Sequence, residues 1–144
     1  MFEKSFLLGA ATAAHQVEGN NLHSDYWIME HLKHSNFVEP SGDACDHYNR
    51  YAEDIALLAR AGCNAYRFGI EWARIEPREG RFDEKEIEHY RRVLLCCKEH
   101  GVTPPCDAAP FFQPGLADLP GRLGYGICGL RLCPLHPEGD AGTG

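Results

Sequence analysis

The stretch that decides the fold is Asn64-Ala65-Tyr66-Arg67-Phe68-Gly69-Ile70, followed by Glu71-Trp72-Ala73-Arg74-Ile75-Glu76-Pro77. Side chains of a strand alternate between two faces, so one face carries three large apolar residues and the other an arginine between two small ones. If helices cover the apolar face, Arg67 points into a barrel or cleft, where a guanidinium needs a carboxylate. The neighbouring sequence offers none in the right place, so we expect Arg67 to meet a ligand or a carboxylate from elsewhere in the fold.

Composition excludes several classes of protein. The 144 residues suffice for one modest domain, and the net charge of −7 argues against nucleic acid or an anionic membrane as partner. No run of about 18 apolar residues occurs, so no membrane span is predicted. The first residues lack the pattern of a secretory signal, and the seven cysteines form no Cys-x-x-Cys pair. These features predict a cytoplasmic chain with free thiols.

The composition changes sharply near Pro104. Residues 106–144 hold 8 of the 15 glycines, 5 of the 9 prolines and 3 of the 7 cysteines, but no lysine. Proline and glycine together make up 13 of these 39 residues, a share typical of low-complexity or unfolded sequence. We therefore divide the chain into a folded part, residues 1–105, and a tail, residues 106–144.

Apolar spacing gives the first elements of the folded part. Residues 6–14 are apolar and small, which predicts a buried strand, and residues 18–46 are polar and predict a long loop. Residues 48–61 have apolar side chains at helical spacing, and Gly62 is a natural C-terminal stop. The strand that contains Arg67 follows at once.

A second helix is expected before the next apolar segment. Asp83 and Glu86 have the spacing of a capping box, Phe82 and Ile87 are placed for a hydrophobic staple, and Gly101 ends the pattern. Helix, glycine and strand thus occur twice in succession. Repeated strand–helix units predict an α/β fold with a parallel sheet and helices outside it.

The motifs now in view resemble glycoside hydrolase family 1, the β-glucosidase type. The resemblance covers residues 6–105 in several ordered and well-spaced segments. They are Phe6-Leu7-Leu8-Gly9-Ala10-Ala11-Thr12-Ala13-Ala14-His15-Gln16-Val17-Glu18-Gly19; Asn21, Ser24-Asp25 and Trp27; Gly42-Asp43-Ala44-Cys45-Asp46-His47-Tyr48 with Tyr51 and Asp54; and residues 66–77. The resemblance implies that residues 1–105 are about the first three βα units of a (β/α)8 TIM barrel, which is incomplete because a whole barrel needs about 250 residues.

The same resemblance assigns roles to individual residues. Gln16 matches the glutamine that hydrogen-bonds the hydroxyls of the bound sugar, and its amide can both donate and accept. Arg67 matches the arginine that contacts the catalytic nucleophile, where a guanidinium would keep that carboxylate ionised and oriented. Glu18, Trp72 and Arg74 are expected to support the site or the barrel rim without touching the sugar.

The two catalytic carboxylates of the family are missing from this chain. Retaining glycosidases use a pair about 5–5.5 Å apart, which the resemblance places in Asn-Glu-Pro and Glu-Asn-Gly motifs on later strands; neither motif occurs here. The parent enzyme would hydrolyse β-glucosides or other small saccharides without a cofactor, and the chain alone is expected to be inactive. The alternatives are a non-catalytic sugar-binding or interaction module and a pseudogene product without function.

The tail departs from the family pattern. The family continues Val-Thr-Leu-x-His-Phe/Trp, but here the chain reads Cys106-Asp107-Ala108-Ala109-Pro110-Phe111. Under the standard genetic code, codons can be chosen for residues 106–123 that, read one base later, restore both histidines and both tryptophans expected of the family. This is the basis of the hypothesis that the tail is an out-of-frame translation of a β-glycosidase gene.

Two groups of cysteine and histidine match no standard zinc spacing. They are His31, His34, Cys45 and His47 in the folded part, and Cys128, Cys133 and His136 in the tail. We therefore predict neither a metal site nor any other cofactor.

Overall fold

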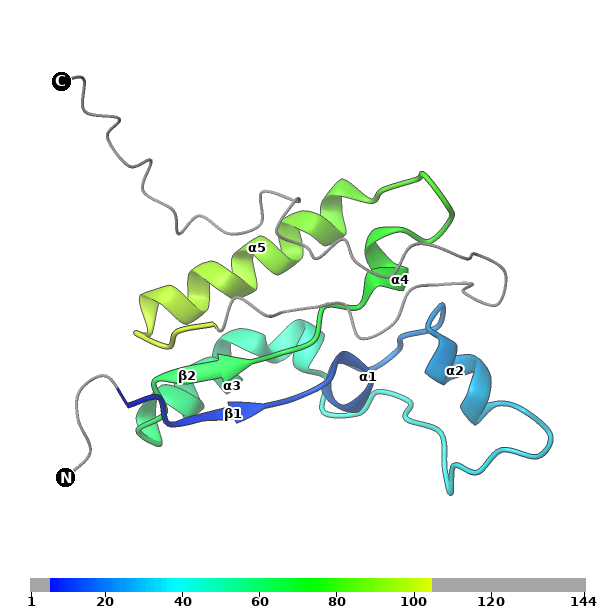
Figure 1. The fold of residues 1–144 in the computed structure, drawn as a ribbon, viewed down its shortest axis with the longest axis horizontal. Coiled ribbons are helices and arrows are strands. Elements are labelled where there is room, and N and C mark those ends of the chain that lie inside the picture. Colours follow the sequence, from blue (N-terminus) through cyan, green and yellow to red (C-terminus); the bar gives the residue numbers. More distant parts are fainter. Residues whose placement is uncertain (1–5, 105–144) are drawn as a thin grey trace, which may run out of the picture.

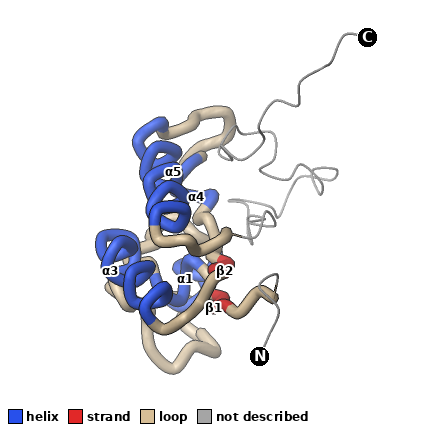
Figure 2. The backbone as a smooth tube through the Cα atoms, turned by 90° about the vertical axis from the view of Figure 1, so that its left-hand side faces the viewer, coloured by secondary structure: helices blue, strands red, loops and turns tan. Residues whose placement is uncertain are grey.

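The computed structural model describes residues 6–104, whose elements alternate as in an α/β fold (Figure 1). In order they are β1 (Gly9–Ala11), α1 (Ala14–Val17), α2 (Asp25–Glu30), α3 (His47–Arg60), β2 (Ala65–Arg67), α4 (Trp72–Ile75) and α5 (Glu84–Glu99). The two long helices, α3 and α5, both lie on the same side of the strands (Figure 2). The expected α/β architecture is confirmed.

The strands form a small parallel sheet. β1 pairs with β2 in parallel, with Ala11 opposite Arg67. On the other side of β2, Ala65 forms a parallel bridge with Thr103, and the Tyr66 N–H donates to the Thr103 carbonyl at 3.0 Å. β2 is therefore the middle of three parallel strand positions, which agrees with about three units of an incomplete barrel.

The apolar face of β2 and its extension supplies the centre of the core. Tyr66, Phe68 and Ile70 are buried, as the alternation predicts, and Arg67 on the opposite face is exposed. They pack with residues from the helices and from the chain after α5, where apolar burial stabilises the fold. These residues are Ile55, Ile75, Ile87, Tyr90, Val93, Cys96, Cys97 and Val102.

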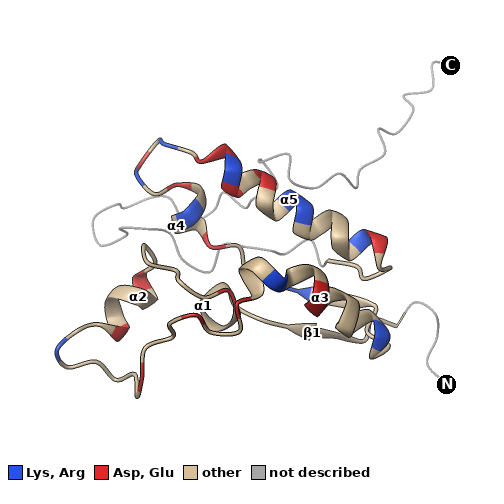
Figure 3. Cartoon of the chain, turned by 180° about the vertical axis from the view of Figure 1, so that it is seen from behind, with Lys and Arg blue, Asp and Glu red and all other residues tan. Residues whose placement is uncertain are grey.

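The long helices end as their sequences indicate. Gly62, after α3, and Gly101, after α5, have φ values of +89° and +69°, a left-handed conformation that costs glycine little. Charged residues of both signs alternate along the exposed surface of α5 (Figure 3), as expected for a solvated outer helix. Within residues 6–104, no helix is both long enough and apolar enough to cross a membrane.

The start of α5 corrects the capping-box prediction. The Asp83 side chain accepts from the Lys85 N–H at 2.9 Å and caps the helix. The Glu86 carboxylate does not return to the Asp83 backbone, because it accepts the Tyr48 hydroxyl of α3 with both oxygens at 3.0 Å. A hydrogen bond between α3 and α5 has thus replaced the bond that a capping box would form between the Glu86 side chain and the Asp83 backbone N–H.

Two further predictions, the length of the first strand and the length of the loop after it, were wrong. The strand expected over residues 6–14 is shorter, because only Gly9–Ala11 pairs with β2, and its apolar flank at Phe6 to Leu8 is exposed. The loop expected over residues 18–46 contains helix α2. This helix is capped by Ser24, whose hydroxyl oxygen accepts from the Trp27 N–H at 3.2 Å.

We expect the purified 144-residue chain to self-associate and to lack a sharp cooperative melt. Apolar side chains beside β1 and on α2 are exposed, and an exposed strand edge templates association. Light scattering after gel filtration, dye binding to apolar surface and near-ultraviolet circular dichroism would test this. A monomer with a steep melting transition would contradict the prediction.

Candidate functional site

Gln16 and Arg67 lie at the same edge of the sheet. Arg67 is the last residue of β2 and is opposite Ala11, the last residue of β1. Gln16 follows five residues later, in the single turn of α1. Because the carboxyl ends of parallel strands meet at one edge of a sheet, both residues occupy the edge where α/β barrels place their active sites.

Both side chains are exposed on this edge. The Gln16 carbonyl oxygen Oε1 accepts from the Ala13 N–H at 3.3 Å, which fixes the side chain against the start of α1. This leaves the amide nitrogen of Gln16 as a donor for a polar ligand. The edge therefore presents an amide and a guanidinium, groups suited to sugar hydroxyls and to a carboxylate.

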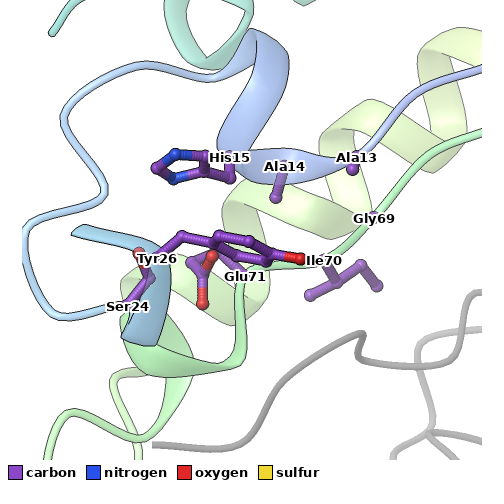
Figure 4. A pocket seen from close by; sticks show the side chains of 8 residues that line it. All are labelled: Ala13, Ala14, His15, Ser24, Tyr26, Gly69, Ile70 and Glu71. Atoms are coloured by element: carbon purple, nitrogen blue, oxygen red, sulfur yellow. The ribbon is translucent and has the colours of Figure 1, made fainter. Parts of the chain in front are cut away.

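A small pocket behind this edge is too small for a sugar. It has a volume of about 30 Å³, enough for a water molecule or two. In Figure 4 the ring of His15 lies over that of Tyr26, and Glu71 also lines the pocket; the two ring centroids are 4.9 Å apart. Neither Gln16 nor Arg67 lines the pocket, so the pocket is separate from the exposed edge.

Glu18 and Arg74, two residues expected to support the site, form an ion pair in which Glu18 is buried and Arg74 is half-buried. Arg74 Nε lies 3.2 Å from Glu18 Oε2 and 2.8 Å from Asn21 Oδ1. Arg74 Nη2 donates to the Gly19 carbonyl at 2.7 Å. One guanidinium thus holds the chain just after Gln16 against α4, which follows β2.

Tyr90 completes this pair from α5. Its hydroxyl donates to Glu18 Oε1 at 2.9 Å and accepts from the Glu71 N–H at 3.0 Å, while only 1% of the residue is exposed. The apolar spacing of the helix assigns Tyr90 only to a buried face and does not reveal this role. The signal that could have revealed it is the hydroxyl, because a tyrosine on a buried helix face needs a polar partner there.

Tyr48 and His89 enclose the pair from α3 and α5. The Arg74 guanidinium lies over the Tyr48 ring, 4.2 Å from its centroid, a cation–π contact. The His89 ring stacks on the same tyrosine with centroids 3.9 Å apart. The Arg74 charge is therefore surrounded by aromatic rings and by carboxylate and carbonyl oxygens.

Burial shifts the ionisation of this cluster. It raises the pKa of Glu18 to about 7, although Arg74 and the Tyr90 hydrogen bond oppose the shift. It raises the pKa of Glu71 as well. For His89, burial lowers the pKa to about 4, and the charges of Arg92 and Arg74 add to this effect. A carboxylic acid and a histidine in the cluster therefore both favour their neutral forms more than in water.

Trp72 does not join the cluster. Its indole N–H donates to Glu76 Oε2 at 2.7 Å, and its ring meets that of Phe82 edge-on at 6.3 Å. The side chain is half-buried and packs against the core. These contacts brace the turn between α4 and α5.

Across residues 6–104, no group of three or more histidine, cysteine and acidic side chains is arranged to hold a metal ion. His47 Nδ1 lies 2.7 Å from Asp54 Oδ2, and the Tyr66 hydroxyl is 3.3 Å from His47 Nε2. His31 stacks on Trp27. Both histidines are thus engaged in structural contacts. The cysteine and histidine group of the tail lies outside the described residues.

A family model described as glycosyl hydrolase family 1 matches residues 1–110. The chain belongs to this family. The predicted family and the prediction of an incomplete TIM barrel are therefore confirmed.

Relatives of this family 1 chain include β-glucosidase A from Thermotoga maritima, 40% identical over 110 residues that make up 72% of this chain and 25% of the relative. The crystal structure of β-glycosidase BGL167 is 61% identical with a TM-score of 0.70, and the match covers 72% of this chain and 25% of that one. A T. maritima β-glucosidase solved in complex with a methoxycarbonyl-substituted glucoimidazole is 38% identical, with a TM-score of 0.67 and coverage of 72% and 25%. The chain spans about a quarter of the length of these relatives.

We expect Tyr90→Phe to loosen the ion pair. The substitution removes a donor from Glu18 and an acceptor from the Glu71 N–H, and each unsatisfied buried group costs about 1–3 kcal/mol. Amide hydrogen exchange would detect faster local opening around Glu71, and it does not require a cooperative melt.

Tyr51→Phe is the matched control for this experiment. Tyr51 packs against the same core from α3, and its hydroxyl makes no hydrogen bond to a described residue. Equal exchange rates in the two variants would mean that the Tyr90 hydroxyl contributes nothing.

Glu18→Gln should remove a pH dependence of stability. Because the pKa of Glu18 is about 7 in the folded chain and 4.5 in the reference state, its protonation favours folding below pH 4.5, and this contribution is lost as pH rises through 7. The stability of the original chain relative to Glu18→Gln should thus fall by about 3 kcal/mol at most between these pH values.

Comparing the original chain with Glu18→Gln cancels the pH dependence of stability that His89 contributes, because both chains carry His89. The folded pKa of His89 is depressed, so its contribution is present above pH 6.5 and is lost as pH falls toward 4. Hydrogen exchange of both chains at pH 5, 6, 7 and 8, corrected for intrinsic rates, would give the difference. A difference that does not change with pH would show that Glu18 stays ionised.

Proposed function

We propose that residues 6–104 supply part of the sugar-binding site of a retaining β-glycosidase that hydrolyses β-glucosides. The observation that carries the proposal is the placement of Gln16 and Arg67, which are both exposed at the carboxyl edge of one parallel sheet. Relatives described as β-glucosidases support the substrate class. In this proposal the Gln16 amide binds sugar hydroxyls.

Arg67 would act on the catalytic nucleophile. Its guanidinium, at the end of the middle strand position, would hold a carboxylate from a later strand ionised and would fix its orientation. Glu18 and Arg74 would hold Gln16 in place, because their ion pair anchors the chain two residues after Gln16. Trp72 would support the rim through its contacts with Glu76 and Phe82.

We propose that the chain alone does not hydrolyse glycosides. The double displacement needs a nucleophile and a proton donor, and neither family motif is present in the sequence. Glu18 cannot replace them, because both of its oxygens are engaged with Arg74 and Tyr90 and the residue is 4% exposed. Glu71 is also buried and accepts from the Ala73 N–H at 3.3 Å.

A second candidate function is a non-catalytic sugar-binding module. It would use the same exposed Gln16 and Arg67 without chemistry, and it requires a well-behaved monomer that binds glucose measurably. In either case a cytoplasmic location is proposed, in keeping with the four free thiols among the described residues, Cys45, Cys63, Cys96 and Cys97.

The tail remains a separate proposal. Residues 106–144 lie outside the described residues, and the family model ends at residue 110. We propose that translation leaves the frame of a β-glycosidase gene near residue 106, because codons compatible with this sequence restore the family pattern in an adjacent frame.

A chimaera tests the proposed role of the described residues. Residues 1–105 would replace the matching segment of BGL167, and we expect the product to hydrolyse an aryl β-glucoside that the 144-residue chain leaves intact. Gln16→Ala and Arg67→Met in the chimaera should each lower kcat/KM by roughly 10²-fold, because each removes a positioned donor at the reacting centre.

Arg60→Met is the matched control, because Arg60 is an exposed arginine at the end of α3. A folded chimaera without activity, or equal rates in all variants, would refute the proposed roles. Turnover by the 144-residue chain alone would refute its proposed inactivity.

Sequencing the gene from the codon for Gly101 to well past that for Gly144 tests the proposed frame change. We expect an adjacent frame to continue through the Asn-Glu-Pro and Glu-Asn-Gly motifs. If all three reading frames reach a stop codon without encoding these motifs, the proposal for the tail is wrong.

A further inference from the structure

A second pocket lies between the chain after α1 and the start of α4. It has a volume of about 170 Å³ and is lined by residues 20–23, Glu71, Ala73 and Arg74. We call it the loop pocket. Neither Gln16 nor Arg67 lines it, so the loop pocket is separate from the edge that carries the proposed sugar-binding residues.

The side chain of Asn21 gives the loop pocket a buried donor without an acceptor. Asn21 is 2% exposed, and its carbonyl oxygen Oδ1 accepts from Arg74 Nε at 2.8 Å. Its amide nitrogen Nδ2 is buried and donates to no described residue. A buried N–H group without an acceptor costs free energy, so a ligand that accepts this hydrogen bond would stabilise the site.

Glu71 and Arg74 add further groups that can bind a polar ligand. The Glu71 oxygen Oε1 accepts from the Ala73 N–H at 3.3 Å, whereas Oε2 accepts from no described residue. Arg74 uses Nε and Nη2 in the hydrogen bonds given above, and its Nη1 donates to no described residue. These bonds hold the guanidinium in place before a ligand arrives, which lowers the entropic cost of binding. The loop pocket therefore offers both donors and an acceptor.

We propose that the loop pocket binds one neutral sugar ring through the side chains of Asn21, Glu71 and Arg74. Each sugar hydroxyl can donate and accept, which matches the mixture of donors and an acceptor, and Leu22 and Ala73 add apolar surface for the C–H groups of the ring. A cavity of about 150 Å³ holds benzene, so a volume of about 170 Å³ suits one six-membered ring. This site lies beyond the proposed function and does not depend on it.

Two charged classes of ligand fit the loop pocket less well. An oxyanion would meet an arginine whose charge Glu18 already balances at 3.2 Å, and the ionised Glu71 carboxylate would repel it. A cation would be repelled by Arg74, and no group of metal-binding side chains occurs among the described residues. Burial raises the pKa of Glu71, so its carboxyl group also takes the neutral form, which can donate to a sugar hydroxyl.

A binding titration tests the loop pocket in the 144-residue chain. The chain would carry Gln16→Ala and Arg67→Met, which remove the proposed sugar-binding residues of the exposed edge. Saturation-transfer nuclear magnetic resonance would be recorded with glucose, with acetate and with inorganic phosphate as separate probes. We expect glucose to bind and the two anions not to bind. No binding of glucose, or binding of either anion as tight as that of glucose, would overturn the proposal.

Glu71→Gln, added to the same chain, addresses the loop pocket directly. The glutamine keeps an oxygen for the Ala73 N–H but replaces the unused carboxyl oxygen by an amide nitrogen, so the Kd for glucose should rise about tenfold. His23→Ala changes an exposed residue of the pocket wall and should raise the Kd roughly threefold.

Glu79→Gln and His34→Ala are the matched controls, because both residues are exposed and neither lines the loop pocket. Both control variants should bind glucose as tightly as the chain without them. Equal Kd values for the pocket variants and the control variants would overturn the proposal, because glucose would then bind elsewhere.

Hydrogen exchange in the chimaera gives a second measurement that does not require the 144-residue chain to be monomeric. With Gln16→Ala and Arg67→Met in place, saturating glucose should slow the exchange of backbone amides in residues 20–23 and at Ala73. Glu71→Gln should weaken this protection at the same glucose concentration. Unchanged exchange at these amides in a folded chimaera would overturn the proposal.

The loop pocket and the proposed function can fail independently. Protection of residues 20–23 by glucose in a chimaera that does not hydrolyse an aryl β-glucoside supports the loop pocket and counts against the proposed function. Hydrolysis by the chimaera without this protection supports the proposed function and overturns the loop pocket.

Discussion

The contact between the buried Glu18 and the half-buried Arg74 is the interaction on which the described part of the molecule depends. It joins the segment after α1 to α4, and the Tyr90 hydroxyl brings in α5. A carboxyl and a guanidinium removed from water stabilise a fold only when their geometry and hydrogen bonds offset desolvation. Here Arg74 is bound by Glu18, Asn21 and Gly19 and lies over the Tyr48 ring, so one cluster holds together elements that are far apart in sequence.

The same cluster explains how exposed functional side chains can be held on a small sheet. Gln16 lies two residues before Glu18 in a four-residue helix, too short to be stable alone. Arg67 ends a strand of three residues. Both positions depend on the ion pair, because it links the chain after Gln16 to the helix after β2. The site is therefore exposed, while the contacts that position it are buried.

The parts of the fold that depend on local pattern were predictable. Alternation around Arg67 correctly assigned Tyr66, Phe68 and Ile70 to a buried apolar face, and Gly62 and Gly101 correctly marked the ends of α3 and α5. The parts that depend on tertiary contacts were not. Glu86 leaves its expected capping partner for the Tyr48 hydroxyl, α2 begins at a serine within a polar stretch, and the ends of a strand depend on where its neighbour stops. Gln16 and Arg67 came from family motifs, whereas Tyr90 is identified by the structure, because a hydroxyl within an apolar pattern gives no sign of its partner.

The hydrogen bond between Tyr90 and Glu18 joins residues 72 positions apart, and this separation has a consequence for synthesis. Closing so long a loop is slow and entropically unfavourable before other contacts form. On the ribosome, the first strand and the turn that carries Gln16 emerge long before α5, and they must wait for it without their anchor. During that interval the nascent chain exposes an apolar strand beside an unpaired acidic group, which is the kind of species that aggregates and on which chaperones act.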